Sequence, residues 1–164
     1  MTSTNEISSK QDKPQVWLYV TIVILLIPLA VTVYLSSKDS DIDATAPLDP
    51  SCDLHRGPCQ SIFPHGGKVS LSIEPRPIRT LKPLQLRVQT EGIEAKSVQV
   101  DFRGVDMNMG YNRPQLKEVA PGEYTGTWVL ASCGLERMVW EATVLIETAG
   151  YKMAAPFRLE TSGR

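Results

Sequence analysis

The sequence predicts an all-β fold: an immunoglobulin-like antiparallel β-sandwich of about 7–8 strands, preceded by one N-terminal transmembrane helix. Three observations support this prediction. Val16–Leu35 holds twenty consecutive uncharged residues, the chain beyond it alternates apolar with polar residues, and all three cysteines of the 164-residue chain follow the uncharged stretch. We therefore predict a cytoplasmic tail (1–15), a transmembrane helix (16–35), a linker (36–51) and an extracytoplasmic β-sandwich domain (52–161).

Val16–Leu35 has the length and composition of a membrane-spanning helix. A hydrocarbon core of about 30 Å requires about 20 helical residues, and a helix satisfies its own backbone hydrogen bonds where water is absent. Trp17 and Tyr34 lie near the two ends of the stretch, where interfacial aromatic residues are common. A cleaved signal peptide is the alternative, with Ala44–Ala46 as the small residues at its cleavage site, but its apolar core would be only about 7–15 residues long.

The charges beside this stretch predict its orientation. Lys10 and Lys13 precede it closely, whereas aspartates follow it at positions 39, 41 and 43. Lysine and arginine favour the cytoplasmic side of a membrane, so the N-terminus is expected in the cytoplasm. The C-terminal domain is then expected on the other side of the cell (inner) membrane, which is the periplasm if the source is a Gram-negative bacterium. Residues 36–51 are rich in Ser, Asp, Ala and Pro, as is typical of a linker.

The strands are predicted from apolar residues that recur at every second position, which is the pattern of half-buried strands. Pairs such as Gly66-Gly67 and Pro121-Gly122 separate these runs and are typical of turns. The predicted strands are Gln60–Phe63, Lys68–Glu74, Leu84–Gln89, Ser97–Arg103, Gln115–Val119, Tyr124–Leu130, Met138–Ile146 and Met153–Leu159.

The cysteines at positions 52, 59 and 133 predict an oxidising compartment and a disulfide. Three cysteines allow three pairings, and at least one thiol is then free, metal-bound or intermolecular. We favour the pair Cys52 and Cys59, with Cys133 free, because Gly57-Pro58 suits a tight turn between the first two. A disulfide between Cys59 and Cys133 is the alternative.

Alternating strand directions would bring several candidate residues to one end of the sandwich. If consecutive strands are antiparallel, the loops 75–82, 104–114 and 131–137 share one end, and the segment Cys52–Cys59 approaches that same end. The linker is expected to arrive there too, so that this end would face the membrane. His65 is expected in a turn at the opposite end.

Met107 and Met109 lie one residue apart in a segment that contains glycine and asparagine. Thioethers are soft ligands that suit Cu(I), while Cys133 would add a thiolate and Met138 a further thioether from the neighbouring loop. The predicted metal site is therefore Met107, Met109 and Cys133, with copper as the cofactor. Packing of both methionines as core filler is the alternative, which their spacing alone favours.

The composition gives little support for an enzyme or for a nucleic-acid-binding protein. The formal net charge is −1, whereas nucleic-acid binding usually requires a basic patch. The sequence contains no G-x-S-x-G motif, Walker motif, dinucleotide fingerprint or histidine-rich zinc spacing. Asp101, Arg103 and Asp106 are expected to be solvated residues of a strand and a loop. We therefore expect a non-enzymatic protein with no catalytic residues.

Three segments together resemble the FixH/YtkA-like family: Asp101–Tyr111 (DFRGVDMNMGY), Pro121–Gly126 (PGEYTG) and Trp140–Val144 (WEATV). Members of that family are small immunoglobulin-like domains, often behind one N-terminal membrane helix. The resemblance covers roughly residues 68–160 and implies a setting in the bacterial cell envelope, near cytochrome oxidase assembly and copper handling. The Cys52–Cys59 element departs from the family pattern, as does Arg137-Met138-Val139 in place of a glycine before the tryptophan.

Two functions follow as expectations. The first is a membrane-anchored envelope accessory protein that assists copper handling or the assembly of a respiratory oxidase. The alternative is a non-enzymatic protein–protein interaction module without bound metal, in which the sandwich presents loops or an edge strand to a partner. In both cases the expected partners are the membrane, through the single-pass helix, and envelope or inner-membrane proteins.

Overall fold

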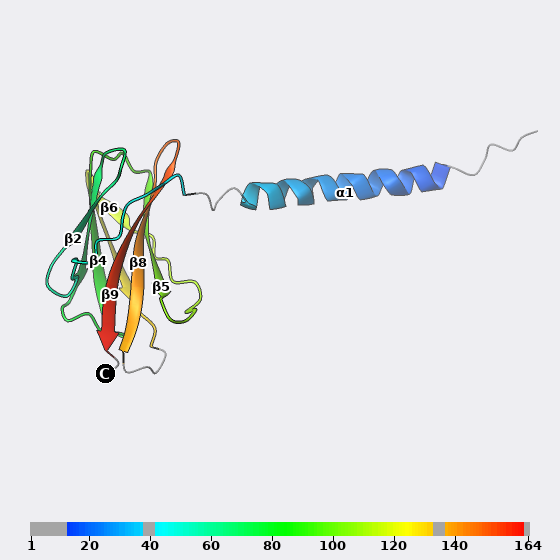
Figure 1. Cartoon of the computed structure of the whole chain (residues 1–164). Coiled ribbons are helices and arrows are strands. Elements are labelled where there is room, and N and C mark those ends of the chain that lie inside the picture. Colours follow the sequence, from blue (N-terminus) through cyan, green and yellow to red (C-terminus); the bar gives the residue numbers. More distant parts are fainter. Residues whose placement is uncertain (1–12, 38–41, 133–136, 163–164) are drawn as a thin grey trace, which may run out of the picture. The chain divides into compact units, whose positions relative to one another are not determined.

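The computed structural model describes residues 13–37, 42–132 and 137–162 (Figure 1). The chain divides into two compact units, Met1–Asp41 and Ile42–Arg164. The described part of the first unit is helix α1 (Lys13–Ser37), whereas the second unit is built of strands.

Helix α1 covers the whole uncharged stretch and contains Pro28. The side chains of its apolar residues are exposed wherever the structure describes them. Within the described ranges, no helix combines the length and the hydropathy that crossing a membrane requires. A helix is thus present at the predicted position, whereas the predicted membrane span is not found among the described residues.

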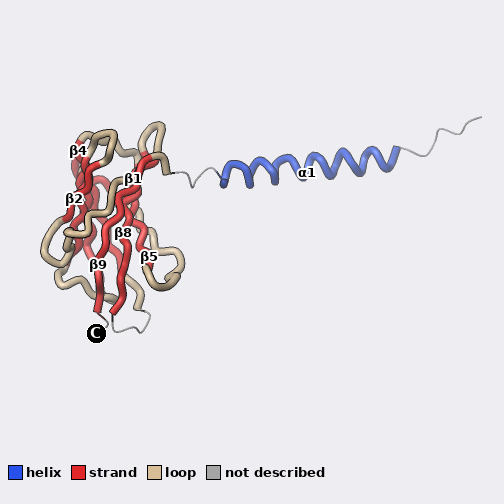
Figure 2. The backbone as a smooth tube through the Cα atoms, in the orientation of Figure 1, coloured by secondary structure: helices blue, strands red, loops and turns tan. Residues whose placement is uncertain are grey.

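Nine strands of the described chain form two sheets (Figures 1 and 2). The four-stranded sheet has the order β1-β9-β8-β5, and the five-stranded sheet has the order β2-β3-β4-β7-β6. Neighbouring strands are antiparallel, except that β1 is parallel to β9. The strands are β1 (Ala44–Thr45), β2 (Cys59–Ile62), β3 (Lys68–Glu74), β4 (Pro83–Glu91), β5 (Ser97–Gly104), β6 (Lys117–Ala120), β7 (Glu123–Val129), β8 (Arg137–Glu147) and β9 (Lys152–Ser162).

The two sheets form a sandwich because each has one apolar face. Along β8, every second residue from Met138 to Ile146 is buried, and the residues between them are half-buried. β3 and β4 show the same alternation. The predicted antiparallel β-sandwich is therefore confirmed at the level of two packed sheets. The largest fully buried side chains are Trp140, Phe63, Phe102, Phe157, Leu54, Leu71, Ile73, Ile78, Leu84, Leu86, Leu130 and Ile146.

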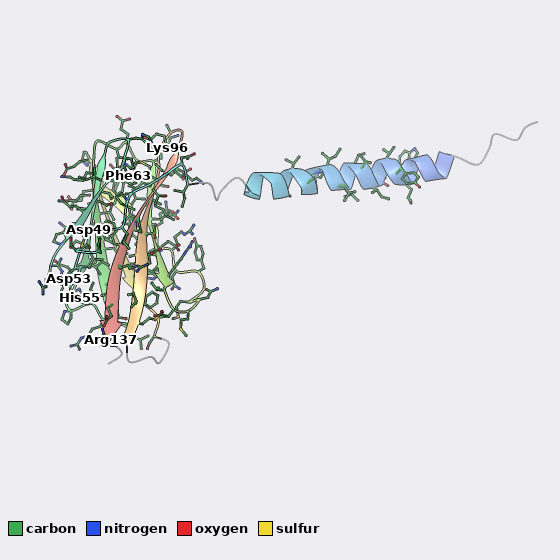
Figure 3. All side chains as sticks on the ribbon, in the orientation of Figure 1. Asp49, Asp53, His55, Phe63, Lys96 and Arg137 are labelled. Carbon is green, nitrogen blue, oxygen red and sulfur yellow. A yellow bond between two sulfur atoms is a disulfide. The ribbon has the colours of Figure 1, made fainter. Side chains whose placement is uncertain are left out.

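The sandwich has two ends, which we call the linker end and the loop end. The linker end carries Ile42 and the turns between β2 and β3, β4 and β5, β6 and β7, and β8 and β9. The loop end carries residues 75–82, residues 105–111 and the start of β8. In Figure 3, Phe63 and Lys96 lie toward the linker end, whereas His55 and Arg137 lie toward the loop end. The prediction that loops 75–82 and 104–114 share one end is confirmed.

The linker joins the sandwich at the end opposite to the predicted one. The backbone N–H of Asp43 donates to the carbonyl of Lys152 (2.9 Å), and β1 pairs with the first residues of β9. Ser162, at the other end of β9, pairs with Arg137. The prediction that the linker arrives beside the Met-containing loop is therefore wrong. The domain also begins about ten residues before the predicted boundary, because β1 and the buried Ala46 belong to it.

The segment before β6 passes from one sheet to the other. The amide of Val100 donates to the carbonyl of Pro114 (3.1 Å), and the amide of Leu116 donates to the carbonyl of Val98 (2.9 Å). From Lys117 onward the chain pairs with β7 in the second sheet. The strand predicted at Gln115–Val119 is thus a strand that changes sheets, and it covers the outer edge of β5.

Candidate functional site

Loop 105–111 is fixed at both of its ends. The amide of Val105 donates to the carbonyl of Val139 on β8 (2.9 Å), and the amide of Phe102 donates to the carbonyl of Asn112 (2.8 Å). These bonds hold Val105, the first residue of the loop, against β8 and Asn112, the residue that follows the loop, against β5. The loop therefore leaves the sheet from a defined stem.

The interior of the loop is also hydrogen-bonded. The side-chain oxygen of Asn108 accepts from the amide of Gly110 (2.8 Å), and the side-chain amide of Asn112 donates to the carbonyl of Met109 (2.8 Å). Gly110 has a φ of 72°, a conformation that favours glycine. Asparagine and glycine here have the turn-forming roles that suit their chemistry, so the loop is hydrogen-bonded within itself.

Asp101 connects the stem to a pair of arginines. The residue is only 6% exposed, and its carboxylate accepts from Nε of Arg103 (2.7 Å) and Nε of Arg113 (3.2 Å). The Arg113 guanidinium lies 5.6 Å from the centroid of the Tyr111 ring, within the range of a cation–π contact. The prediction that Asp101 is solvated is therefore wrong, because two guanidinium groups provide the partners that a buried carboxylate needs.

Despite this order, the loop exposes apolar side chains. Val105 is 46%, Met107 39% and Tyr111 81% exposed. Single exposed apolar residues are common on any protein surface, but three on one internally bonded loop are more typical of a binding surface.

The predicted metal ligands are brought together only in part. A Cβ built on Gly104 would lie 2.5 Å from Cε of Met138, 2.6 Å from the backbone carbonyl oxygen of Met107 and 3.2 Å from Cγ of Met109. Met138 is buried and Met109 is half-buried against the core, whereas the side chain of Met107 is exposed. Met109 and Met138 are thus neighbours, and the third predicted ligand, Cys133, lies outside the described residues.

Other metal-binding side chains do not complete this group. Across the described ranges, no three His, Cys, Asp or Glu side chains are arranged to hold a metal ion. Cys52 and Cys59 are bonded to each other, so neither can supply a thiolate. The metal site at Met107, Met109 and Cys133 stays a prediction, and the methionine side chains that the structure places next to Gly104 are those of Met109 and Met138.

The disulfide between Cys52 and Cys59 confirms the favoured pairing and excludes the alternative bond to Cys133. The two Cα atoms are 5.6 Å apart, which is within the usual range for a disulfide. Cys59 opens β2 and pairs with Leu71 of β3. The bridge therefore fastens the segment before β2 to the edge of the five-stranded sheet.

His55, inside the disulfide loop, bonds two segments that are distant in sequence. Its Nε2 lies 2.6 Å from the carbonyl oxygen of Glu160, and its Nδ1 accepts from the amide of Ile78 (3.3 Å). Because the amide of Ile78 can only donate, we assign the ring proton to Nε2. Sequence reasoning missed this contact, since His55 and Glu160 are 105 residues apart and no periodicity connects a loop histidine with a strand end.

Glu160 also forms a bidentate ion pair at the loop end. Its carboxylate accepts from Nε (2.6 Å) and Nη2 (2.7 Å) of Arg137. These hydrogen bonds are the main reason that the pKa of Glu160 is lowered and that of Arg137 is raised. Both side chains are exposed, so the pair contributes little to stability.

Replacing Arg137 by alanine is expected to raise the pKa of Glu160 toward its ordinary value, because both hydrogen bonds to the carboxylate are lost. A carboxylate with a lowered folded-state pKa stabilises the fold above its unfolded pKa, and this stability is lost as the pH falls through the folded pKa. The variant should therefore show a weaker acid dependence of the free energy of unfolding. Carboxyl ¹³C NMR titration measures the pKa. Arg56→Ala, which removes a pair with Asp53, is the control, and an equal shift in both variants would contradict the assignment.

Comparisons with known proteins do not place the chain in a family. No protein-family model matches it, and no curated protein matches it. An engineered protein of known crystal structure is similar at a TM-score of 0.45 and 16% identity, over 61% of this chain and 21% of that one. A DUF4785 family protein from Legionella pneumophila is similar at a TM-score of 0.41 and 13% identity, over 58% of this chain and 28% of that one. The chain thus spans less than a third of either protein, and the resemblance to the FixH/YtkA-like family stays a prediction.

Proposed function

We propose that the chain is a membrane-anchored interaction module of the cell envelope, in which an immunoglobulin-like sandwich binds a membrane or envelope protein through loop 105–111. The observation that carries this proposal is the contrast within the loop: its backbone is hydrogen-bonded, yet Val105, Met107 and Tyr111 are exposed. A loop that is already ordered loses little conformational entropy on binding. Tyrosine and methionine are among the residues enriched at protein interfaces.

The anchoring part of the proposal rests on the uncharged stretch Val16–Leu35 and on the charges that flank it. The disulfide supports a location outside the cytoplasm, because such bonds persist in oxidising compartments. A helix anchored in the inner membrane would confine the domain and its partner to one surface, which raises their effective concentration. Such confinement allows even a weak contact through a small loop to form a populated complex.

Binding rather than catalysis is supported by how the polar groups near the loop end are used. Both oxygens of Asp101 accept from arginines. Both ring nitrogens of His55 are engaged with backbone groups. A general base requires a nitrogen or oxygen within reach of a substrate proton, and these side chains are committed to structural bonds.

The proposal predicts a partner that contacts Tyr111. A photo-crosslinking amino acid at this position, in the full-length chain expressed in membranes of its source organism, should give one discrete adduct after irradiation. The matched control is Val119, which is 59% exposed but lies on β6 in the other sheet. Adducts of equal yield at both positions, or none at Tyr111 in a chain that still forms its disulfide, would contradict the proposal.

Copper handling is a second candidate, favoured by the neighbouring side chains of Met109 and Met138 at Gly104. Two thioethers in a partly apolar setting suit Cu(I). Titration of the full-length chain with Cu(I) against a chelator of known affinity should then show binding that weakens by about tenfold or more in Met109→Leu/Met138→Leu. Met153→Leu, a buried methionine of β9, is the control. Failure to compete with the chelator would remove copper from consideration.

A further inference from the structure

The segment between β1 and β2 leads from the four-stranded sheet to the five-stranded sheet. The amide of Ala46 donates to the carbonyl of Ala154 on β9 (2.9 Å), and the hydroxyl of Ser61 on β2 donates to the carbonyl of Pro47 (3.3 Å). The residues between these contacts and β2 include Leu54, which is fully buried in the core. A core position is thus filled from a loop rather than from a strand.

The loop between the two cysteines is a compact turn. The amides of Arg56 and Gly57 both donate to the carbonyl of Asp53 (3.0 and 3.2 Å), and the amide of His55 donates to the Asp53 carboxylate (3.0 Å). These three bonds all lie within residues 53–57, so breaking the disulfide does not remove them. Figure 3 shows Asp53 and His55 next to each other on this side of the sandwich.

Three attachments hold the turn in place. The disulfide closes it at Cys52 and Cys59, Leu54 inserts into the core, and His55 bonds the amide of Ile78 and the carbonyl of Glu160. The disulfide is the attachment that a chemical signal can remove. Cys59 is buried, whereas Cys52 is half-buried, so Cys52 is the more accessible of the two residues.

We propose that the Cys52–Cys59 loop is a redox-controlled latch, which reduction by a dithiol opens to release His55 from Ile78 and Glu160 and to uncover Leu54. A thiolate of the dithiol attacks Sγ of Cys52, the disulfide breaks, and Cys59 leaves as a thiolate that takes up a proton. The second thiol of the reductant then displaces Cys52 as a thiol, and the reductant ends as a disulfide. This inference does not depend on the function proposed for loop 105–111.

Opening would change the surface in a defined way. Leu54 and Ile78 are fully buried with the latch closed. When the latch opens, Leu54 and His55 would move away from the sandwich, and an apolar patch and the carbonyl of Glu160 would be uncovered. Since loop 105–111 is fixed to β5 and β8, it should keep its arrangement when the latch opens.

Hydrogen exchange at the amide of Ile78 tests the latch, because this amide is bonded to His55 when the latch is closed. The full-length chain with Cys133→Ser, which leaves a single pair of cysteines, is compared before and after dithiothreitol. Reduction should accelerate exchange at Ile78 by about tenfold or more, while the amide of Val88 in the centre of the five-stranded sheet stays protected. Cys52→Ser/Cys59→Ser should reproduce the reduced state.

Two further variants separate the latch from a general loss of stability. In the oxidised chain, His55→Ala should accelerate exchange at Ile78, whereas Arg56→Ala, which removes only an exposed ion pair with Asp53, should not. A change of less than about twofold at Ile78 on reduction, or an equal acceleration at Val88, would overturn the proposal. In the latter case the disulfide acts on the whole sandwich and no separate latch exists.

Discussion

Trp140→Ala is expected to lower the free energy of unfolding of the sandwich by about 3–5 kcal/mol. Trp140 is fully buried on β8, and it lies between Gly104 of β5 and Leu159 of β9 in the sheet register. Truncation would leave a cavity that rigid sheet neighbours cannot close. It would also remove the bond from Nε1 to the hydroxyl of Thr161 (3.0 Å), whose side chain is buried.

Denaturant unfolding of the full-length chain in detergent, followed by circular dichroism of the strands, measures this loss. Trp17→Ala is the matched control, because Trp17 is exposed on α1 and belongs to the other compact unit. Thr161→Val isolates the hydrogen bond and should cost about 1–2 kcal/mol. A loss below about 1 kcal/mol in Trp140→Ala would mean that the tryptophan does not organise this part of the core.

The strands that the sequence could predict are those with one buried face and one face that is more exposed to solvent. β8 is the clearest example. Burial alternates along its whole length, so each apolar residue indicates which face of the strand lies against the core. β1 could not be predicted in this way. It has two residues, pairs in parallel with β9, and its composition is that of a linker, so the domain boundary was misplaced with it.

The contacts of the candidate site were harder to predict for a different reason. The disulfide joins residues only seven apart, so chain proximity favours it. The bond from His55 to Glu160 instead depends on how the two sheet edges meet, and nothing in the local sequence records this. Asp101 is an intermediate case: Arg103 lies two residues away on the same face of β5, a spacing that could have indicated the ion pair.

Gly104→Ala is expected to displace loop 105–111 and to lower the free energy of unfolding by about 1–3 kcal/mol. The added Cβ would lie 2.5 Å from Cε of Met138 and 2.6 Å from the backbone oxygen of Met107. The methyl group of Met138 is the flexible end of a side chain and can turn aside. The backbone at Met107 cannot yield without moving the loop, since Val105 is bonded to Val139.

Exchange at the amide of Val105, together with the Tyr111 crosslink, measures the displacement. Gly57→Ala is the control, because no atom lies within 4 Å of a Cβ at that position. Met138→Leu in the Gly104→Ala background removes the crowded methyl group and should restore part of the stability, but the contact with Met107 persists and the crosslink should stay weak. If stability and the crosslink recovered together, the methionine contact would be the whole cause. Recovery of stability alone would instead show that glycine at this position sets where the loop lies, separately from how firmly the sandwich is folded.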